Sequence, residues 1–439
     1  MARRIFRGER LKTARRLRAM TLTALASETG ISKQSISLYE NGENTPEYER
    51  GCKIAAALHV PYDFFFQVDG CSTTTPVTYF RSLSSATRLD RSAQSLKLEF
   101  VAKAYEALLT YLDFPQLNLP AVNFTYVDDE YNDDAVNAMA TEIEQVASYL
   151  RSYWNLGNGP IVDLQYVLES NGIIVTGFET GTGTIDAFSQ RTILPDGEIC
   201  FIALDQGAKP EGRIRFDMAH ELGHLLLHPW SEELDNIPKD EFRMRETQAN
   251  MFASSFLLPR DSFGKDVEMY PTDLKYYLWL KKKWNASVQS MIYRSHQIGV
   301  ITSNQYQYLM RQISKNGWRQ NEPDDSPYYL NENMFQGAVD LLKDNHILTI
   351  HGILSLFADH GVSLFPEEIE KLLHLSSGTL LEKRKSNSVV QLKLNNNTTP
   401  SSKAFEVKQA ARTFESTSIE DTSDLIKEFC RRKEHDADS

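Results

Sequence analysis

Two histidines and a glutamate lie at helical spacing in the segment Phe216–His228. His220 and His224 are four residues apart, and Glu221 directly follows the first of them. Residues four apart lie on the same face of a helix, about 6 Å along its axis. Both imidazoles can therefore reach one Zn²⁺, and Glu221 can reach a water bound to that metal. The spacing is that of a zinc peptidase, in which two histidines and a third protein ligand hold the ion.

The neighbours of this pattern favour chemistry over a chance match. They are small or apolar, and the first proline is Pro229, so a continuous buried helix is predicted. Unpaired charge would be costly in such a helix, and a bound metal explains the cluster. Bound Zn²⁺ lowers the pKa of its water, and Glu221 is then placed to accept the proton and pass it to the leaving amine.

The third ligand is expected from the next helix, predicted from about 242 to 258 and ended by Pro259. Glu246 is the preferred ligand. Asn250 follows one turn later and is predicted to hold a ligand's second nitrogen or carboxylate from the outer shell. Glu241 is the competing acid, but it falls near the helix start, where the helix dipole already favours an acidic residue.

His228 is another candidate ligand. A continuous helix would put it roughly 12 Å beyond His220, too far for three imidazoles to converge on one ion. The preferred interpretation of His228 is a histidine at a helix C-terminus, next to Pro229.

Residues from about 173 to 260 resemble the ImmA/IrrE family of metallopeptidases, a gluzincin-like group. The matching segments are Ile185–Ser189, Ile199–Leu204, Phe216–His228, Glu246–Ala253 and Leu257–Pro259. The resemblance implies His220, His224 and Glu246 as metal ligands and Glu221 as general base. Gln248 stands where the family often has a second acid, which leaves Glu246 as the one carboxylate of its turn.

The apolar run Ile199–Leu204 is predicted to be a strand just before the active helix. As an edge strand it could hold an extended peptide by backbone pairing. The alternative is a purely structural strand.

The N-terminus combines a basic head with a helix-turn-helix pattern. Residues 1–20 hold eight Lys/Arg and one acid, in a chain of formal net charge −12. This suggests a polyanion partner for the head, and the alternative is a solvated helix face. Helices are predicted at 22–28 and 32–40, and Ser32 is the expected N-cap of the second.

Residues 7–66 resemble the XRE/Cro helix-turn-helix family. The resemblance rests on Leu11, Leu17, Leu25–Ala26, Gly30–Ser32, Ile36–Gly42, Pro46 and Ile54–Leu58. It implies a dimer on paired half-sites, with the second helix of the motif in the major groove. The DNA contacts that it implies are Lys33, Gln34 and Ser35 at base edges and Ser37, Asn44 and Arg15 at phosphates.

Length and composition bound the class of protein. A chain of 439 residues predicts two to four units, and 41% apolar with 24% charged residues is typical of soluble globular proteins. No apolar run approaches a membrane span, and the basic N-terminus lacks the apolar segment of a secretion signal. The four cysteines show no paired spacing. A cytoplasmic protein that does not engage a membrane is expected.

The predicted fold class is a multidomain, mainly α protein with an α+β zinc-peptidase core and an N-terminal all-α helix-turn-helix domain. The predicted order is a helix-turn-helix domain (1–70), a linker and helical connector (71–130), the peptidase core (131–265), a helical helix-turn-helix-like extension (266–325), a small helical module (326–384) and a largely disordered tail (385–439).

These features predict a DNA-binding transcriptional regulator with zinc-dependent endopeptidase activity. The family resemblance implies cleavage of a repressor-like or partner protein in a stress, prophage or mobile-element response. The rival is the antitoxin of a toxin–antitoxin pair, which represses its operon and binds the toxin without needing catalysis. A plain repressor with a vestigial metal site is a third possibility. The expected partners are operator double-stranded DNA, a protein substrate or toxin, and a second copy of the chain.

Overall fold

The computed structural model describes residues 5–68, 74–80, 87–124, 133–178, 187–195, 197–205, 209–229, 237–325, 327–328 and 330–381. All of these belong to one unit, Met1–Lys383, and the tail from Arg384 forms another. The predicted disordered tail (385–439) lies outside the described residues. Within the described ranges, no helix is both long enough and apolar enough to cross a membrane.

The N-terminal domain is a bundle of short helices. Its elements are α1 (Gly8–Leu17), α2 (Leu22–Thr29), α3 (Lys33–Glu40), α4 (Tyr48–Ala57) and the 3₁₀ helix η1 (Tyr62–Phe66). Ser32 caps α3 by accepting a hydrogen bond from the Ser35 amide, as the sequence predicts. Gly30 ends α2 with φ +70°, a left-handed conformation that glycine adopts at low cost. The turn between α2 and α3 thus follows from local sequence.

A strand lies inside the region predicted to be a linker. Residues Thr74–Phe80 form β1, and α5 (Arg88–Leu109) follows it. The prediction of a linker and helical connector over 71–130 contained no strand, so β1 corrects it. Pro76 favoured the linker interpretation, but β1 is an edge strand, where a proline is tolerated because alternate N–H groups face away from the sheet.

The central sheet has the strand order β1-β3-β4-β2. Its other strands are β2 (Ile173–Phe178), β3 (Ala187–Leu194) and β4 (Gly197–Asp205). β3 is antiparallel to both β1 and β4, whereas β2 is parallel to β4. β4 is therefore an inner strand, and the hypothesis that Ile199–Leu204 forms a peptide-binding edge was wrong.

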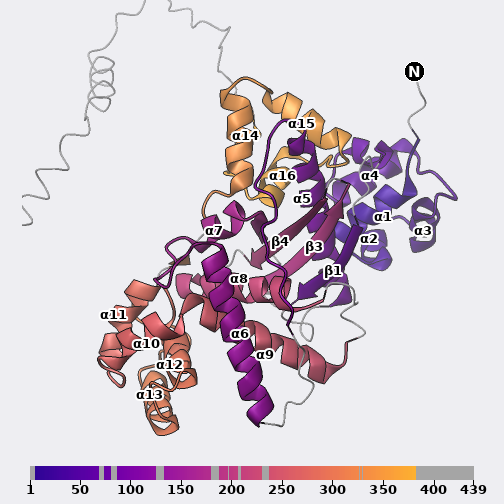
Figure 1. Ribbon diagram of the computed structural model, residues 1–439. Helices are drawn as coiled ribbons and strands as arrows, with labels where there is room; N and C mark the ends of the chain where they lie inside the picture. The colour runs from indigo at the N-terminus through magenta and orange to yellow at the C-terminus, as the bar shows by residue number, and fades with distance from the viewer. Residues whose placement is uncertain are drawn as a thin grey trace, which may run out of the picture. The chain divides into compact units, whose positions relative to one another are not determined.

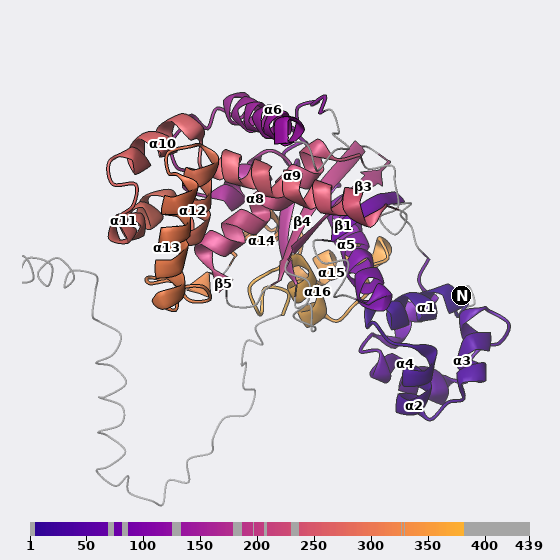
Figure 2. The same cartoon turned by 90° about the horizontal axis from the view of Figure 1, so that it is seen from below.

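Helices cover both faces of this sheet, which explains why β4 is apolar at successive positions. Ile199, Phe201 and Ala203 belong to one buried cluster, and the alternate residues Cys200, Ile202 and Leu204 belong to another. The second face is covered by α6 (Asp133–Tyr153), α7 (Leu164–Ser170), α8 (Glu211–Leu227) and α9 (Lys239–Leu257). Figures 1 and 2 show α8 and α9 on this face of the sheet.

The remaining helices continue these two clusters. The elements α10 (Arg260–Glu268), α11 (Leu274–Trp284), α12 (Val288–Gln297) and α13 (Ser303–Lys315) pack onto the α8–α9 side. A short pair of strands, β5 (Lys209–Pro210) and β6 (Pro327–Tyr328), precedes α14 (Met334–Asp344), α15 (Ile350–Asp359) and α16 (Pro366–Leu373). The predicted extension therefore shares a core with the peptidase segment.

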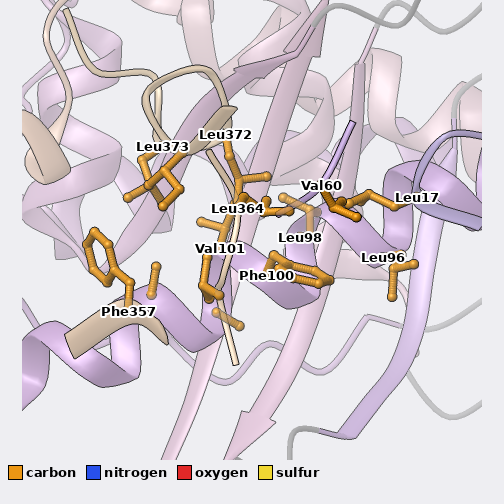
Figure 3. Close-up of a cluster of buried hydrophobic side chains, with 14 of the residues drawn as sticks. Leu17, Val60, Leu96, Leu98, Phe100, Val101, Phe357, Leu364, Leu372 and Leu373 are labelled. Carbon is orange, nitrogen blue, oxygen red and sulfur yellow. The ribbon is translucent and has the colours of Figure 1, made fainter. Parts of the chain in front are cut away.

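One buried cluster joins the N-terminal domain, α5, the sheet and the last three helices. Figure 3 shows Leu17 and Val60 beside Leu98 and Phe100 of α5, with Leu364 and the α16 leucines nearby. Arg10 adds a buried polar tie, because its guanidinium donates to the Gly361 carbonyl at 2.8 Å. The cluster spans several of the predicted units.

Arg15 and Glu40 form a buried ion pair between α1 and α3. Arg15 Nε and Nη2 lie 2.6 and 2.8 Å from the two Glu40 carboxylate oxygens, and the side chains are 10% and 5% exposed. Arg15 Nη1 also donates to the Met20 carbonyl. The predicted phosphate contact of Arg15 is contradicted by this geometry, since the guanidinium is already engaged inside the domain.

Removing one partner of this pair should destabilise the N-terminal domain. Glu40→Ala leaves a buried cation unpaired, which typically costs about 3–5 kcal/mol. Hydrogen-exchange mass spectrometry on the α1 and α3 peptides measures the local free energy of unfolding. The double variant Arg15→Met/Glu40→Leu is the control and should recover most of the loss. Unchanged exchange in Glu40→Ala would contradict a structural role for the pair.

Candidate metal centre and DNA-binding face

The two helices of the candidate centre approach each other closely. Gly223 on α8 permits this, because a Cβ there would lie 3.1 Å from Phe252 Cδ1 and 3.2 Å from Ala249 Cα on α9. His220 and Glu221 are completely buried and His224 is almost so. The close contact brings Glu246, one turn before Asn250 on α9, to the face of α8 that carries both histidines.

Three donor groups converge between the helices. The Nε2 atoms of His220 and His224 are 3.0 Å apart, and they lie 3.5 and 3.2 Å from the nearer carboxylate oxygens of Glu246. These donor atoms all lie within 4.8 Å of one another. Tetrahedral zinc with bonds of 2.0–2.1 Å separates its ligand atoms by about 3.3 Å. The donor set therefore fits Zn²⁺ in both type and spacing.

Asn250 fixes the orientation of His220. Its Oδ1 lies 3.0 Å from His220 Nδ1. A carbonyl oxygen can only accept a hydrogen bond, so the ring carries its proton on Nδ1 and turns the Nε2 lone pair toward the centre. This is the position predicted for Asn250.

Glu241 is engaged elsewhere. It lies 2.5 Å from Arg245 on the same helix and is not part of the converging group. The structure thus separates the two acids that the sequence offered as third ligand, and it places Glu246 at the histidines.

The start of α3 presents the polar side chains predicted to contact DNA. Lys33, Gln34 and Asn44 are exposed, and Ser35 and Ser37 are half-buried. Ser35 Oγ also lies 2.8 Å from Ser32 Oγ. Apart from Arg15, all of the predicted contact residues lie at or next to the surface of the domain.

Three cations of the basic head, in contrast, are engaged within the fold. The Arg10 guanidinium stacks 3.9 Å from the Phe64 ring centre. Arg18 Nη1 lies 2.7 Å from Oε2 of Glu368, which belongs to the first turn of α16. Arg15, Arg10 and Arg18 therefore stabilise the domain and its contacts, so the count of cations in residues 1–20 overstated the charge available to DNA.

Comparison with protein families assigns two parts of the chain. Residues 11–65 match the helix-turn-helix model, and residues 169–296 match a peptidase-family model described as the IrrE N-terminal-like domain. The chain joins these two domains. Over 57 residues it is 44% identical to RghRB, an uncharacterized HTH-type transcriptional regulator of Bacillus subtilis (strain 168); the match spans 13% of this chain and 41% of that protein.

Among solved structures, a Mycobacterium tuberculosis transcriptional regulator matches at 19% identity with a TM-score of 0.27. The match covers 36% of this chain and 47% of that one.

In the IrrE-like domain, His228 lies behind His224. α8 ends at Leu227, and His228 has extended backbone angles, φ −112° and ψ 145°. The chain therefore turns there, and His228 Nδ1 comes within 2.9 Å of His224 Nδ1. The position of His228 at the helix end was predicted correctly. Its contact with His224 was missed, because that contact depends on this turn.

A chain of hydrogen bonds sets the tautomers of His228 and His224. Gln248 Oε1 lies 3.0 Å from His228 Nε2 and accepts a hydrogen bond from its N–H. Burial and the nearby His224 lower the pKa of His228 well below its usual value, so the ring is neutral and its Nδ1 accepts. His224 then donates from Nδ1, and its Nε2 lone pair is left to face Glu246. Gln248 thus provides the acceptor oxygen that a carboxylate could also provide at this position.

His228→Phe is expected to weaken zinc binding by about 10–100-fold, the usual effect of losing an outer hydrogen-bond partner of a ligand. Competition with a chromophoric chelator measures the dissociation constant directly. Gln248→Glu is the matched control, since a carboxylate still accepts from His228 Nε2. Wild-type zinc affinity in His228→Phe would show that the ring only fills space.

Ser189 of β3 orients Glu221. Its Oγ donates to Glu221 Oε2 at 2.7 Å, and both residues are completely buried. The sequence contained a signal for this contact, because a serine in a strand buried on both faces needs a hydrogen-bond partner. It could not identify the partner, which lies on another element.

Glu246 is anionic in this environment. Burial alone would raise its pKa, but when His220 and His224 are protonated, their hydrogen bonds and charges outweigh burial and lower the pKa of Glu246 to about 2. The deprotonated carboxylate is the form that binds a metal.

Proposed function

We propose that this protein is a transcriptional regulator that binds operator DNA through α3 and hydrolyses a protein partner at a zinc site between α8 and α9. The observation that carries the peptidase half is the convergence of His220 Nε2, His224 Nε2 and the Glu246 carboxylate. Each histidine is also held through its second nitrogen. Such paired support is expected of a working ligand set.

The chain's own residues would act as follows. Zn²⁺ bound to these donors supplies an activated water and polarises the scissile carbonyl. Glu221 takes a proton from the water and gives it to the leaving amine. Ser189 keeps the Glu221 carboxylate in one rotamer through Oε2. Burial of the cluster excludes bulk water and strengthens each of these electrostatic contacts.

The test compares wild type with Glu221→Gln in the native host. Proteins captured by each form are identified by mass spectrometry, and their N-termini are mapped. A partner that is intact with the variant and shortened with wild type supports the peptidase and names its substrate. Purified protein that does not bind zinc would remove the enzymatic half of the proposal.

The second candidate function is that of an antitoxin, in which the IrrE-like domain grips a toxin without cleavage. Complete burial of His220 and Glu221 favours this alternative, since no scissile bond reaches them without a structural change. The same experiment separates the two, because an antitoxin would hold an intact partner equally well in both forms. In either case we propose a cytoplasmic protein that binds its operator as a homodimer.

Gln34→Ala is expected to weaken binding to the operator by about 1–3 kcal/mol, because glutamine pairs with adenine through two hydrogen bonds. Lys33→Ala removes a second base or phosphate contact and should also flatten the salt dependence. Fluorescence anisotropy on DNA upstream of the gene measures both at fixed salt. Lys275→Ala, an exposed lysine on α11 of the IrrE-like domain, is the control and should bind normally. Equal affinity of Gln34→Ala and wild type would exclude α3 as the reading helix.

A further inference from the structure

Strand β3 carries Ser189, which orients the proposed base Glu221, and β3 is also the strand with which β1 pairs. Ser189, which donates to Glu221, lies opposite Tyr79 in the β1–β3 pair, and Phe188 lies opposite Phe80. Neighbouring strands are about 4.8 Å apart. Backbone of residues 74–80 therefore runs one strand spacing from the residue that orients the catalytic carboxylate.

This edge of the sheet is the one suited to a peptide. The sheet ends at β1 on one side and at β2 on the other, and β2 is separated from β3 by β4. An extended segment that pairs with β3 would lie next to Ser189 and Glu221, whereas one that pairs with β2 would not. Added strands bind through main-chain hydrogen bonds at such edges.

β1 is the least regular strand of the sheet. The β3–β4 and β2–β4 registers run without interruption over eight and six pairs. The β1–β3 register shifts between Thr74 and Val77 and is continuous only from Val77 to Phe80, four pairs. Pro76 lies in the irregular part and has no N–H to donate. This pairing should be the easiest of the three to break.

We propose that β1 occupies the side of β3 at which an extended substrate segment binds. An extended, unfolded segment of a protein substrate pairs antiparallel with β3 in its place, and hydrolysis requires β1 to leave. The requirement that β1 leave before hydrolysis rests on the proposed peptidase function. The exchange of strands is a binding event that can be measured by itself.

A cross-link tests this directly in the full-length chain. Thr78 and Gln190 are opposite one another, and facing Cα atoms of antiparallel strands lie within the range of a disulfide. Thr78→Cys/Gln190→Cys is oxidised or reduced, and binding of a fluorescein-labelled, end-capped peptide with the sequence of residues 74–80 is followed by anisotropy. We expect at least tenfold weaker binding to the oxidised form than to the reduced form.

Three further variants guard against failure of this pair to fold or oxidise. Thr74→Cys/Ile193→Cys joins another facing pair, at the half-exposed Ile193. Thr78→Pro and Tyr79→Pro are compared as a pair, because only one of them removes an N–H that faces β3. Alternate N–H groups of an edge strand face its neighbour, so one proline breaks a ladder hydrogen bond and should raise peptide affinity at least tenfold, while the other is its matched control. Oxidised wild type and the single cysteine variants control for oxidation itself.

The outcomes separate the two proposals. Equal peptide affinity in oxidised and reduced forms, or no peptide binding by any form, overturns the role of β1. If binding switches with the cross-link but no form shortens any protein captured from the native host, strand exchange stands and the peptidase proposal fails. If a captured protein is shortened equally with β1 locked in place, the peptidase proposal stands and the inference about β1 falls.

Discussion

Glu221→Gln is expected to lower the rate of peptide-bond hydrolysis by about 10²–10⁴-fold, the usual share of a general base, while zinc remains bound. Glutamine has nearly the same shape and its amide oxygen can still accept the Ser189 hydroxyl. It cannot take a proton from water at neutral pH. Initial rates on the partner identified in the host, together with zinc content by atomic emission, measure both effects.

Ser189→Ala is the companion variant. It removes the hydrogen bond that positions Glu221 but leaves the carboxylate, so its loss of rate should be smaller and zinc content unchanged. A Glu221→Gln protein that cleaves at the wild-type rate would exclude Glu221 as the base. Loss of zinc along with activity would show instead that the variant disturbs the site.

Glu246→Gln is expected to weaken zinc binding by more than 100-fold, since losing a direct ligand should exceed the 10–100-fold effect of losing an outer partner. The neutral amide no longer offers the anionic oxygen that faces both histidines. Zinc should then fail to raise the melting temperature, because ligand stabilisation follows the ratio of free metal to its dissociation constant.

Glu241→Gln is the matched control for this prediction. It makes the same chemical change on the same helix, but Glu241 pairs with Arg245 and not with the histidines. Chelator competition and thermal shifts should therefore match wild type. Similar losses in both variants would show that α9 acid charge, and not ligation by Glu246, controls zinc affinity.

Local spacing made much of the fold and site predictable. The period of a helix alone places His220 and His224 on one face with Glu221 beside them. The Ser32 cap and Gly30 turn follow from the intrinsic conformations of those residues. The strand nature of Ile199–Leu204 also followed, but the edge hypothesis overlooked that an apolar residue at every position is typical of an inner strand.

Contacts between elements were not predictable in the same way. Arg15 looks like a DNA contact until its pairing with Glu40 is seen, and Pro76 makes β1 look like a linker. His228 joins the site only because the chain turns at the end of α8. In each case the residue type allows several partners, and the sequence contains no measure of which one lies near.

The sequence by itself determined a helix-turn-helix domain and a helix that carries two histidines and a glutamate at the spacing a metal site requires. Only the tertiary structure decided that Arg15 pairs with Glu40, that Gln248 and His228 set a tautomer, and that β1 fills the edge beside Ser189. The physical reason is that periodicity fixes neighbours within one element, whereas neighbours across elements depend on packing, such as the close approach that Gly223 permits.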